Sequence, residues 1–275
     1  SLDNDNVDFY IHIDKKSKVI FDIPKNDNVY VLDNNIKVYW GSYTFNDAVM
    51  LMIKKAKKIN KYDYFVLISG ADYPIRSNNF ILNFFKKNKG KEFINICKMP
   101  DNDKGFDRLD YYFISTADRN NHFTNRLKRV INIVIRKAHI KRKYPQKYQK
   151  LTMYGGSNWW ALSNECINYI LKFVKNNPEF VQFYKNTYIP EEMFFHTIIG
   201  NSKFIKSVTS TITYTDWSPK KGPLPATINS NYIPLFKKRY LPTDYSNKKQ
   251  IALFARKFED ISTETLNEID KKLRS

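Results

Sequence analysis

Two adjacent glutamates follow a proline in the segment "TYIPEEMFFH", residues 187–196. Three large apolar residues and a histidine come directly after Glu191 and Glu192. On a helix, adjacent side chains point about 100° apart, so one carboxylate can be solvated while the other faces a cleft. A glutamate held against aromatic rings has a raised pKa and can accept a proton during catalysis. The alternative is ordinary, because acidic side chains are favoured in the first turn of any helix.

Two further carboxylates come at the ends of strand-like runs, "HID" at 12–14 and "SGADYP" at 69–74. Polar residues at the carboxyl ends of strands in an α/β sheet face the ligand crevice. Asp14 could accept hydrogen bonds from a ribose or uracil, or it could cap the next element. Asp72 could bind a metal or a sugar hydroxyl, or it could satisfy backbone N–H groups of its own turn.

The sequence has no pattern typical of a metal or cofactor site. No Asp-x-Asp pair stands directly at the end of a predicted strand, and the one in "DNDNVD" precedes its strand, which argues against a metal-chelated diphosphate. There is no Walker-type loop, no GxGxxG motif and no Cys/His spacing suited to zinc. We therefore expect no cofactor and no divalent metal.

The segment "GGSNWWALS", residues 155–163, has features of a sugar-contacting surface. Its two glycines allow a close approach of the backbone to a ligand, and two tryptophans offer ring faces. Because side chains alternate along a strand, one of Trp159 and Trp160 should point into the core. At most one of them is therefore available to a ligand.

The composition is that of a globular protein with a strong positive charge. The chain has 275 residues, of which 42% are apolar and 16% aromatic, enough for one large domain or two small ones. A net charge of +19 favours an anionic partner such as nucleic acid, an anionic membrane or a phosphorylated substrate, or else reflects a solvated Lys-rich surface. Two cysteines and no signal peptide or long apolar run are typical of a cytoplasmic chain.

Hydrophobic periodicity predicts alternating strands and helices, which indicates an α/β fold with mainly parallel strands. Strands are predicted at 29–32, 36–41, 92–97 and 207–217. Two more are predicted within 7–17, which ends in a polar turn, and within 62–75, which runs into a Gly/Asp/Pro turn. Helices are predicted at 44–60, 77–88, 164–174, 190–202 and 262–274. Ser163 is the expected N-cap of the helix that follows it. Residues 218–247 are predicted to form a loop.

The segment 126–150, "RLKRVINIVIRKAHIKRKYPQKYQK", contains a basic amphipathic helix. Its apolar residues include Val130, Ile131, Val134 and Ile135. This stripe could pack on the domain, as on most solvated helices. Alternatively the helix could contact anionic lipid headgroups or a phosphate-bearing acceptor.

Seven motifs stand in an order typical of one enzyme family. They are "YIHIDKKS", "VYWGSYTFNDAVM", "YFVLISGADYPIRS", "GGSNWWALSNECINYI", "PEEMFFHTIIGNS", "YTDW" and "LFARKF". With them the chain resembles the core-2/I-branching β-1,6-N-acetylglucosaminyltransferases, glycosyltransferase family 14, which also contains peptide O-xylosyltransferases. It looks most like the soluble bacterial members. The resemblance covers about residues 7–260.

The resemblance implies a GT-A-type fold, with a Rossmann-like, mainly parallel central sheet flanked by helices. It implies a single catalytic domain over 1–275, with a nucleotide-sugar half at 1–98 and an acceptor and catalytic half at 99–275. A basic helical insertion is expected at about 120–150. Family members also have a strand and helix before "YIHID" that support the uracil. We expect that first strand to be missing here, so that either the donor site is incomplete or the native protein has further residues.

The resemblance also assigns roles to residues. Glu192, the second acidic residue of the "P-[DE]-E" motif, corresponds to the general base. Glu191 is then expected to be a first-turn helix residue exposed to water, and the three apolar residues 193–195 are expected to anchor the segment that carries Glu192. Asp14 corresponds to the uridine-side carboxylate, and Lys257 to a cation on the diphosphate. The resemblance places a second diphosphate cation at Arg239, with Lys238 beside it. The strand ends and the basic segment themselves add further donor-side candidates, which are His12, Ser69, Gly70, Asp72 and Arg256. The acceptor-side candidates are Arg108, Trp159, Tyr214 and Trp217.

The expected activity is an inverting, metal-independent transfer of a sugar from a UDP-sugar to a hydroxyl of a glycan acceptor. GlcNAc is the first donor sugar to consider, with xylose or another UDP-sugar as the alternative. The acceptor could be a lipid-linked oligosaccharide, with the enzyme peripheral on the inner face of a bacterial plasma membrane. A non-catalytic polyanion-binding protein is a distant alternative, and nucleic acid is not an expected partner. A glycoside hydrolase is disfavoured, because adjacent helical glutamates diverge and cannot flank one bond.

Overall fold

The computed structural model describes residues 5–101, 105–115, 122–219, 222, 224–243, 249–259 and 262–275. The helices are α1 (Thr44–Ile59), α2 (Asn78–Lys87), α3 (Asp107–Asp110), α4 (His122–Lys137), α5 (Asn164–Asn176), α6 (Pro178–Lys185), α7 (Phe194–Gly200), α8 (Ile233–Phe236) and α9 (Thr263–Ile269), and α9 continues as a π-helical turn over Asp270–Arg274. The strands are β1 (Phe9–Ile11), β2 (Val29–Val31), β3 (Tyr64–Val66), β4 (Asp72–Pro74), β5 (Glu92–Ile94), β6 (Cys97–Lys98), β7 (Tyr154–Gly155), β8 (Trp160–Ser163), β9 (Val208–Thr209), β10 (Thr213–Thr215), β11 (Leu241–Pro242), β12 (Lys249–Gln250) and β13 (Phe254–Arg256).

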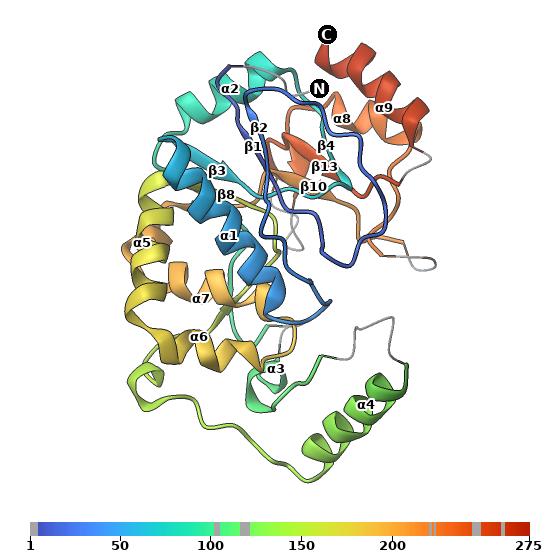
Figure 1. Ribbon diagram of the computed structural model, residues 1–275. Helices are drawn as coiled ribbons and strands as arrows, with labels where there is room; N and C mark the ends of the chain where they lie inside the picture. Colours follow the sequence, from blue (N-terminus) through green and yellow to red (C-terminus); the bar gives the residue numbers. More distant parts are fainter. Residues whose placement is uncertain are drawn as a thin grey trace.

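Two sheets position the candidate site. The larger has the strand order β3-β8-β5-β9, and β8 is antiparallel to both of its neighbours, whereas β5 and β9 are parallel. The second has the order β10-β13-β4, with β13 parallel to β10 and antiparallel to β4. In Figure 1, α1 and α5 lie beside β3 and β8, and α7 and then α6 follow below them. The predicted α/β fold of GT-A type is thus confirmed.

The expectation of mainly parallel strands is wrong. It assumed that each helix returns the chain to the same end of the sheet. Instead the chain leaves the sheet after β5 through β6 and comes back through β7, which pairs antiparallel with β6. It therefore enters β8 in the direction opposite to β5.

The hydrophobic core joins both halves of the chain. Its largest cluster includes Met50 of α1, Trp160 of β8, Ile167 of α5, Phe180 of α6 and Phe194 of α7. A second cluster lies between the β10-β13-β4 sheet and helices α8 and α9. Burial of these apolar side chains is the main favourable contribution to folding.

The expected cap of α5 is confirmed, and a buried carboxylate supports it. The hydroxyl of Ser163 accepts a hydrogen bond from the Cys166 N–H at 3.2 Å. The same hydroxyl and the Ser163 N–H donate to the two carboxylate oxygens of Glu92, at 2.5 and 2.8 Å. Glu92 is fully buried, and burial raises its pKa. The end of β8 is thereby tied to β5.

Several predicted boundaries differ from the structure. Residues 36–41 form no strand, because side-chain bonds from the end of β1 hold this segment instead of a sheet partner. The predicted helix 190–202 is divided into a 3₁₀ turn at Pro190–Glu192 and α7. Within the predicted loop 218–247, the described residues form α8 and β11.

The predicted basic helix is present as α4, which lies apart from the other helices (Figure 1). Residues 120 and 121, at the start of the expected insertion, lie outside the described part of the chain. In that described part, no helix is both long enough and apolar enough to cross a membrane.

Candidate active site

The two glutamates lie on a tightly held 3₁₀ turn, Pro190–Glu192. Ile189, just before it, has the left-handed values φ 50° and ψ 55°, an uncommon conformation for a β-branched residue. Its N–H donates to the carbonyl of Gly41 at 3.1 Å, which connects the turn to the start of α1. Such conformations persist where the surrounding structure fixes them, and they cluster at functional sites.

Burial after the turn fixes its other end. Met193, Phe194 and Phe195 are at most 1% exposed, so the expectation that they anchor the carboxylate-bearing segment is confirmed. The N–H of Met193 donates to the Pro190 carbonyl at 3.0 Å and closes the turn.

Glu192 forms an ion pair with Arg108. Nη1 of Arg108 lies 2.7 Å from Oε2 of Glu192, and the two side chains are 17% and 27% exposed. A charge-assisted bond of this length orients a carboxylate. The sequence assigned these residues separately, to the acceptor side and to the base, and the structure brings them together from α3 and the 3₁₀ turn.

Glu191 is buried, so the expectation that it is a solvated first-turn residue is wrong. The residue is 7% exposed, and its Oε2 has no hydrogen-bond partner among the described residues. Burial, and then the neighbouring charge of Glu192, raise the pKa of Glu191 to about 7. Because Ile189 leads into the turn in the left-handed conformation and the turn itself is 3₁₀, Glu191 points inward and Glu192 points outward.

The segment Gly156–Trp159 is fastened to this turn. The Gly156 N–H donates to the carbonyl of Glu192 at 2.9 Å. A Cβ at Gly156 would lie 1.8 Å from the carbonyl oxygen of Asn95, so only glycine fits there. The close approach that this glycine permits is to the protein's own backbone.

The rest of the segment is also held by side chains. The Ser157 carbonyl lies 3.0 Å from Nε2 of His196, and Thr211 Oγ1 donates to the Trp159 carbonyl at 2.8 Å. Trp160 is 3% exposed in the core, as strand alternation predicted for one of the pair. The ring of Trp159 instead lies against the guanidinium of Arg256, whose Cζ is 3.9 Å from the ring centroid.

Arg256 joins this tryptophan to the turn after β3. Its Nη1 lies 3.6 Å from Oδ1 of Asp72, whose side chain is fully buried. Oδ2 of Asp72 accepts from the Ser69 N–H at 2.5 Å and from the Ser69 hydroxyl at 2.6 Å. Burial raises the pKa of Asp72, and the positive charge of Arg256 opposes that rise. Of the two roles considered for Asp72, the geometry is that of the turn carboxylate.

The remaining predicted residues differ in exposure. Gly70 is exposed on the same turn, and Lys257 is 38% exposed with its Nζ 3.7 Å from Glu259 Oε1. Trp217 is 43% exposed, whereas Tyr214 is 6% exposed within the second core cluster. Arg239 is exposed and lies over the ring of Tyr240.

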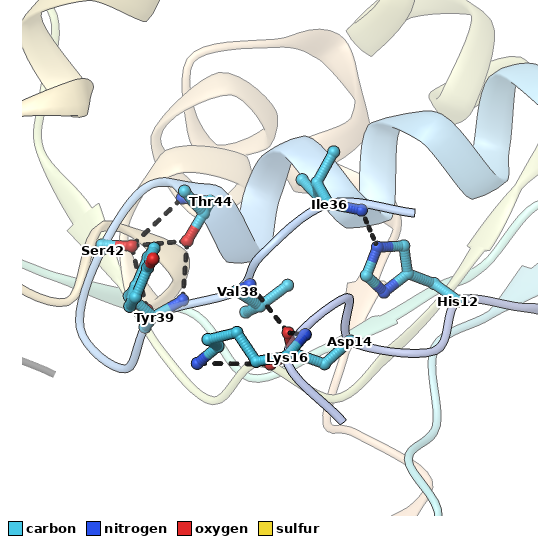
Figure 2. A network of polar contacts seen from close by, with 8 residues as sticks. All are labelled: His12, Asp14, Lys16, Ile36, Val38, Tyr39, Ser42 and Thr44. Atoms are coloured by element: carbon cyan, nitrogen blue, oxygen red, sulfur yellow. Dashed lines mark hydrogen bonds and ion pairs between the residues drawn. The ribbon is translucent and has the colours of Figure 1, made fainter. Parts of the chain in front are cut away.

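His12 and Asp14 organise the end of β1, as Figure 2 shows. Nε2 of His12 accepts a hydrogen bond from the Ile36 N–H at 3.0 Å, and burial lowers the pKa of His12. Oδ1 of Asp14 accepts from the N–H groups of Lys16 and Val38, at 2.9 and 3.4 Å. The Asp14 side chain remains 36% exposed, so a ligand can still reach it.

Within the described ranges, no group of three or more His, Cys, Asp or Glu side chains could hold a metal ion. The expectation of a metal-independent reaction stays a prediction.

The Gly156–Trp159 segment connects the Arg108–Glu192 pair to the Arg256–Asp72 pair. Gly156 is bonded to Glu192, and Trp159 packs on Arg256. Three residue steps span at most about 11 Å between Cα atoms, so a short segment joins the turn that carries Glu192 to the tryptophan that packs on Arg256. This connection makes Glu192 a candidate base and the Arg256 cluster a candidate source of positive charge.

Comparison with known protein families gives a match over most of the chain. The family model described as Core-2/I-Branching enzyme matches residues 3–239. The chain belongs to the Core-2/I-Branching enzyme family. This is the glycosyltransferase family that the ordered motifs predicted.

Relatives of this Core-2/I-Branching family member include animal xylosyltransferases. The chain is 25% identical over 292 residues to Xylosyltransferase 1 of Rattus norvegicus, covering 96% of this chain and 32% of the relative. It is 25% identical over 286 residues to Xylosyltransferase 2 of Homo sapiens, covering 95% and 30%. It is 25% identical over 285 residues to the Xylosyltransferase of Ciona intestinalis, covering 96% and 30%. The chain thus spans about a third of the length of these curated relatives.

Sequence reasoning missed two features of this family member's site. One is the burial of Glu191, and the "YIPEE" segment carries no local signal for a left-handed isoleucine. The other is the Arg108–Glu192 pair, which joins residues 84 positions apart. The glycine pair 155–156 indicates a close approach, but residue spacing does not identify the Asn95 carbonyl as the group that approaches Gly156.

The raised pKa of Glu191 predicts an unusual pH dependence of stability. Between pH about 4.5 and about 7 the native state keeps a proton that the unfolded chain releases, so the free energy of unfolding falls as pH rises. Glu191→Gln removes this titration. The free energy of unfolding of the variant minus that of wild type, measured by urea denaturation, should therefore be about 2–3 kcal/mol higher at pH 8 than at pH 5.

The matched control is Glu179→Gln, which changes an exposed acid in the first turn of α6. It should follow the wild type at both pH values. A Glu191→Gln variant that also followed the wild type would contradict the burial of a proton at this site.

Proposed function

We propose that this chain transfers a sugar from a UDP-sugar to a hydroxyl of a glycan acceptor, with inversion at C1 and with Glu192 as the general base. The observation that carries the proposal is the Glu192 carboxylate itself, partly exposed and held by Arg108 at 2.7 Å. It stands one short segment from the cationic cluster around Arg256.

An inverting transfer requires a base for the acceptor hydroxyl and positive charge for the departing diphosphate. One base removes the proton from the acceptor hydroxyl as the oxygen attacks C1 on the face opposite the diphosphate. Glu192 suits this role better than Glu191, because an acceptor can reach a side chain that is 27% exposed, whereas Glu191 is 7% exposed. The proton passes to the carboxylate, and the bond from C1 to the diphosphate oxygen breaks.

The departing diphosphate requires positive charge. Lys257 is the accessible cation of the cluster, since it is 38% exposed, and Arg256 lies beside it on β13. Arg256 is 14% exposed and is already paired with Asp72, so its role is to add fixed positive charge and to hold Trp159. Fixed charges at a developing anion are a large contribution to enzymatic rate.

Asp14 is proposed to contact the uridine. It lies at the carboxyl end of β1 and retains exposed surface beside its backbone bonds. UDP-GlcNAc is the first donor to test. UDP-xylose is the second candidate, because the related proteins are named xylosyltransferases. A lipid-linked or free oligosaccharide is the proposed acceptor.

The role of Glu192 predicts the effect of Glu192→Gln. The amide cannot accept the proton, so kcat of transfer should fall about 10²–10⁴-fold, while the affinity for UDP changes little. Radiolabelled sugar transfer and UDP titration calorimetry measure the two quantities. Full transfer activity in this variant would remove the proposed base. Loss of UDP binding together with activity would mean that the residue serves the fold or the donor instead.

The transfer is further predicted to need no divalent metal, because cationic side chains at β13 neutralise the diphosphate. Activity with an active donor should persist in EDTA at the level seen with added Mn²⁺. Inactivation by EDTA with rescue by Mn²⁺ would overturn this part of the proposal.

A further inference from the structure

Helix α4 presents an apolar face to solvent. Phe123 is 81% exposed, Leu127 55%, Val130 50% and Val134 52%. With steps of 100° per residue these four side chains lie in one narrow sector of the helix. Large apolar side chains gathered in one exposed patch are characteristic of an interaction surface.

The polar side of α4 lies against the protein instead. The amide of Asn132 donates to the Ile114 carbonyl at 2.9 Å and accepts from its N–H at 3.0 Å. Arg136 pairs with Asp107 at 3.6 Å, and Asn125 is 8% exposed. The usual order of a surface helix, apolar inside and polar outside, is reversed. The reading in which the apolar stripe packs on the domain is therefore wrong for this helix.

All Asp, Glu, Lys and Arg positions in helix α4 and the segment after it are occupied by Lys or Arg. Residues 122–150 contain no Asp or Glu. Their Lys and Arg residues are Arg126, Lys128, Arg129, Arg136, Lys137, Lys141, Arg142, Lys143, Lys147 and Lys150. On the helix, Arg126 and Lys137 border the apolar sector, from which they can extend toward anionic groups.

We propose that α4 docks this protein onto an anionic lipid surface. The apolar sector enters the boundary of the acyl chains, and the bordering cations contact the headgroups. A second copy of the chain is a poorer occupant, because it would bring another acid-free segment of a +19 protein against this one. An anionic bilayer offers both the apolar interior and the opposite charge.

The docking face is connected to the proposed active site. Segment 105–115, on which α4 rests, carries Arg108. The chain after α4 returns to the same place, where the Arg142 N–H donates to the Asp110 carbonyl at 2.7 Å and Lys141 pairs with Asp110 at 3.3 Å. Segment 105–115 thus supports the docking helix and also supplies Arg108 to Glu192. This docking goes beyond the proposed transfer and does not depend on it.

The test is sedimentation of the 275-residue chain with vesicles. Two preparations are compared, phosphatidylcholine alone and phosphatidylcholine mixed with phosphatidylglycerol. We expect binding to the mixed vesicles that weakens as salt rises. In Leu127→Gln/Val134→Gln the apparent affinity for them should fall at least about tenfold, with an unchanged melting temperature, because both side chains are exposed.

Two matched variants control for nonspecific effects. Val19→Gln/Ile20→Gln removes apolar side chains that are even more exposed, from another segment, and it should bind as wild type does. Arg126→Glu/Lys137→Glu should lose binding, whereas Lys55→Glu/Lys58→Glu, with the same change of net charge on α1, should lose much less.

Three results would overturn the proposal. They are no binding of wild type to the mixed vesicles, equal losses in the α4 variants and their controls, and a wild-type dimer that Leu127→Gln/Val134→Gln converts to a monomer. The last result would show that a second copy covers the helix. Because vesicle binding requires no donor or acceptor, it can succeed or fail independently of sugar transfer.

Discussion

The ion pair between Arg108 and Glu192 joins the turn that carries the proposed base to the segment that supports helix α4. Its carboxylate comes from a 3₁₀ turn held between Gly41, Gly156 and the buried start of α7. Its guanidinium comes from a segment that also supports the basic helix α4. A bond of 2.7 Å between partly buried charges orients both groups, so it relates the proposed base to the proposed membrane face.

The adjacency of two like charges is resolved by their different environments. Glu191 points into the protein, where burial favours its protonated form near neutral pH. Glu192 points outward and is paired with a cation. The two side chains therefore need not be ionised together, and only the second is available to a substrate. Adjacent carboxylates with separate environments can perform separate tasks.

Local signals predicted much of the fold. Helix α1 and the Ser163 cap of α5 follow from apolar periodicity and from an N-cap serine, which act within a few residues. The antiparallel entry of β8 depends on the β6–β7 pairing across more than fifty residues, and no local pattern encodes it. The same holds for the site. Motif order indicated Glu192 and Arg108, but their contact, the burial of Glu191 and the fit of Gly156 against Asn95 depend on packing between distant segments.

The central claim is that Arg108 acts on the reaction by orienting the Glu192 carboxylate. A double-mutant cycle of kcat at saturating substrates, with Arg108→Met, Glu192→Gln and the combined variant, tests this most directly. If the claim is right, Arg108→Met lowers kcat in the wild-type background but changes it little once Glu192 is an amide. Independent effects that multiply in the double variant would contradict it, because Arg108 would then act on the reaction without Glu192.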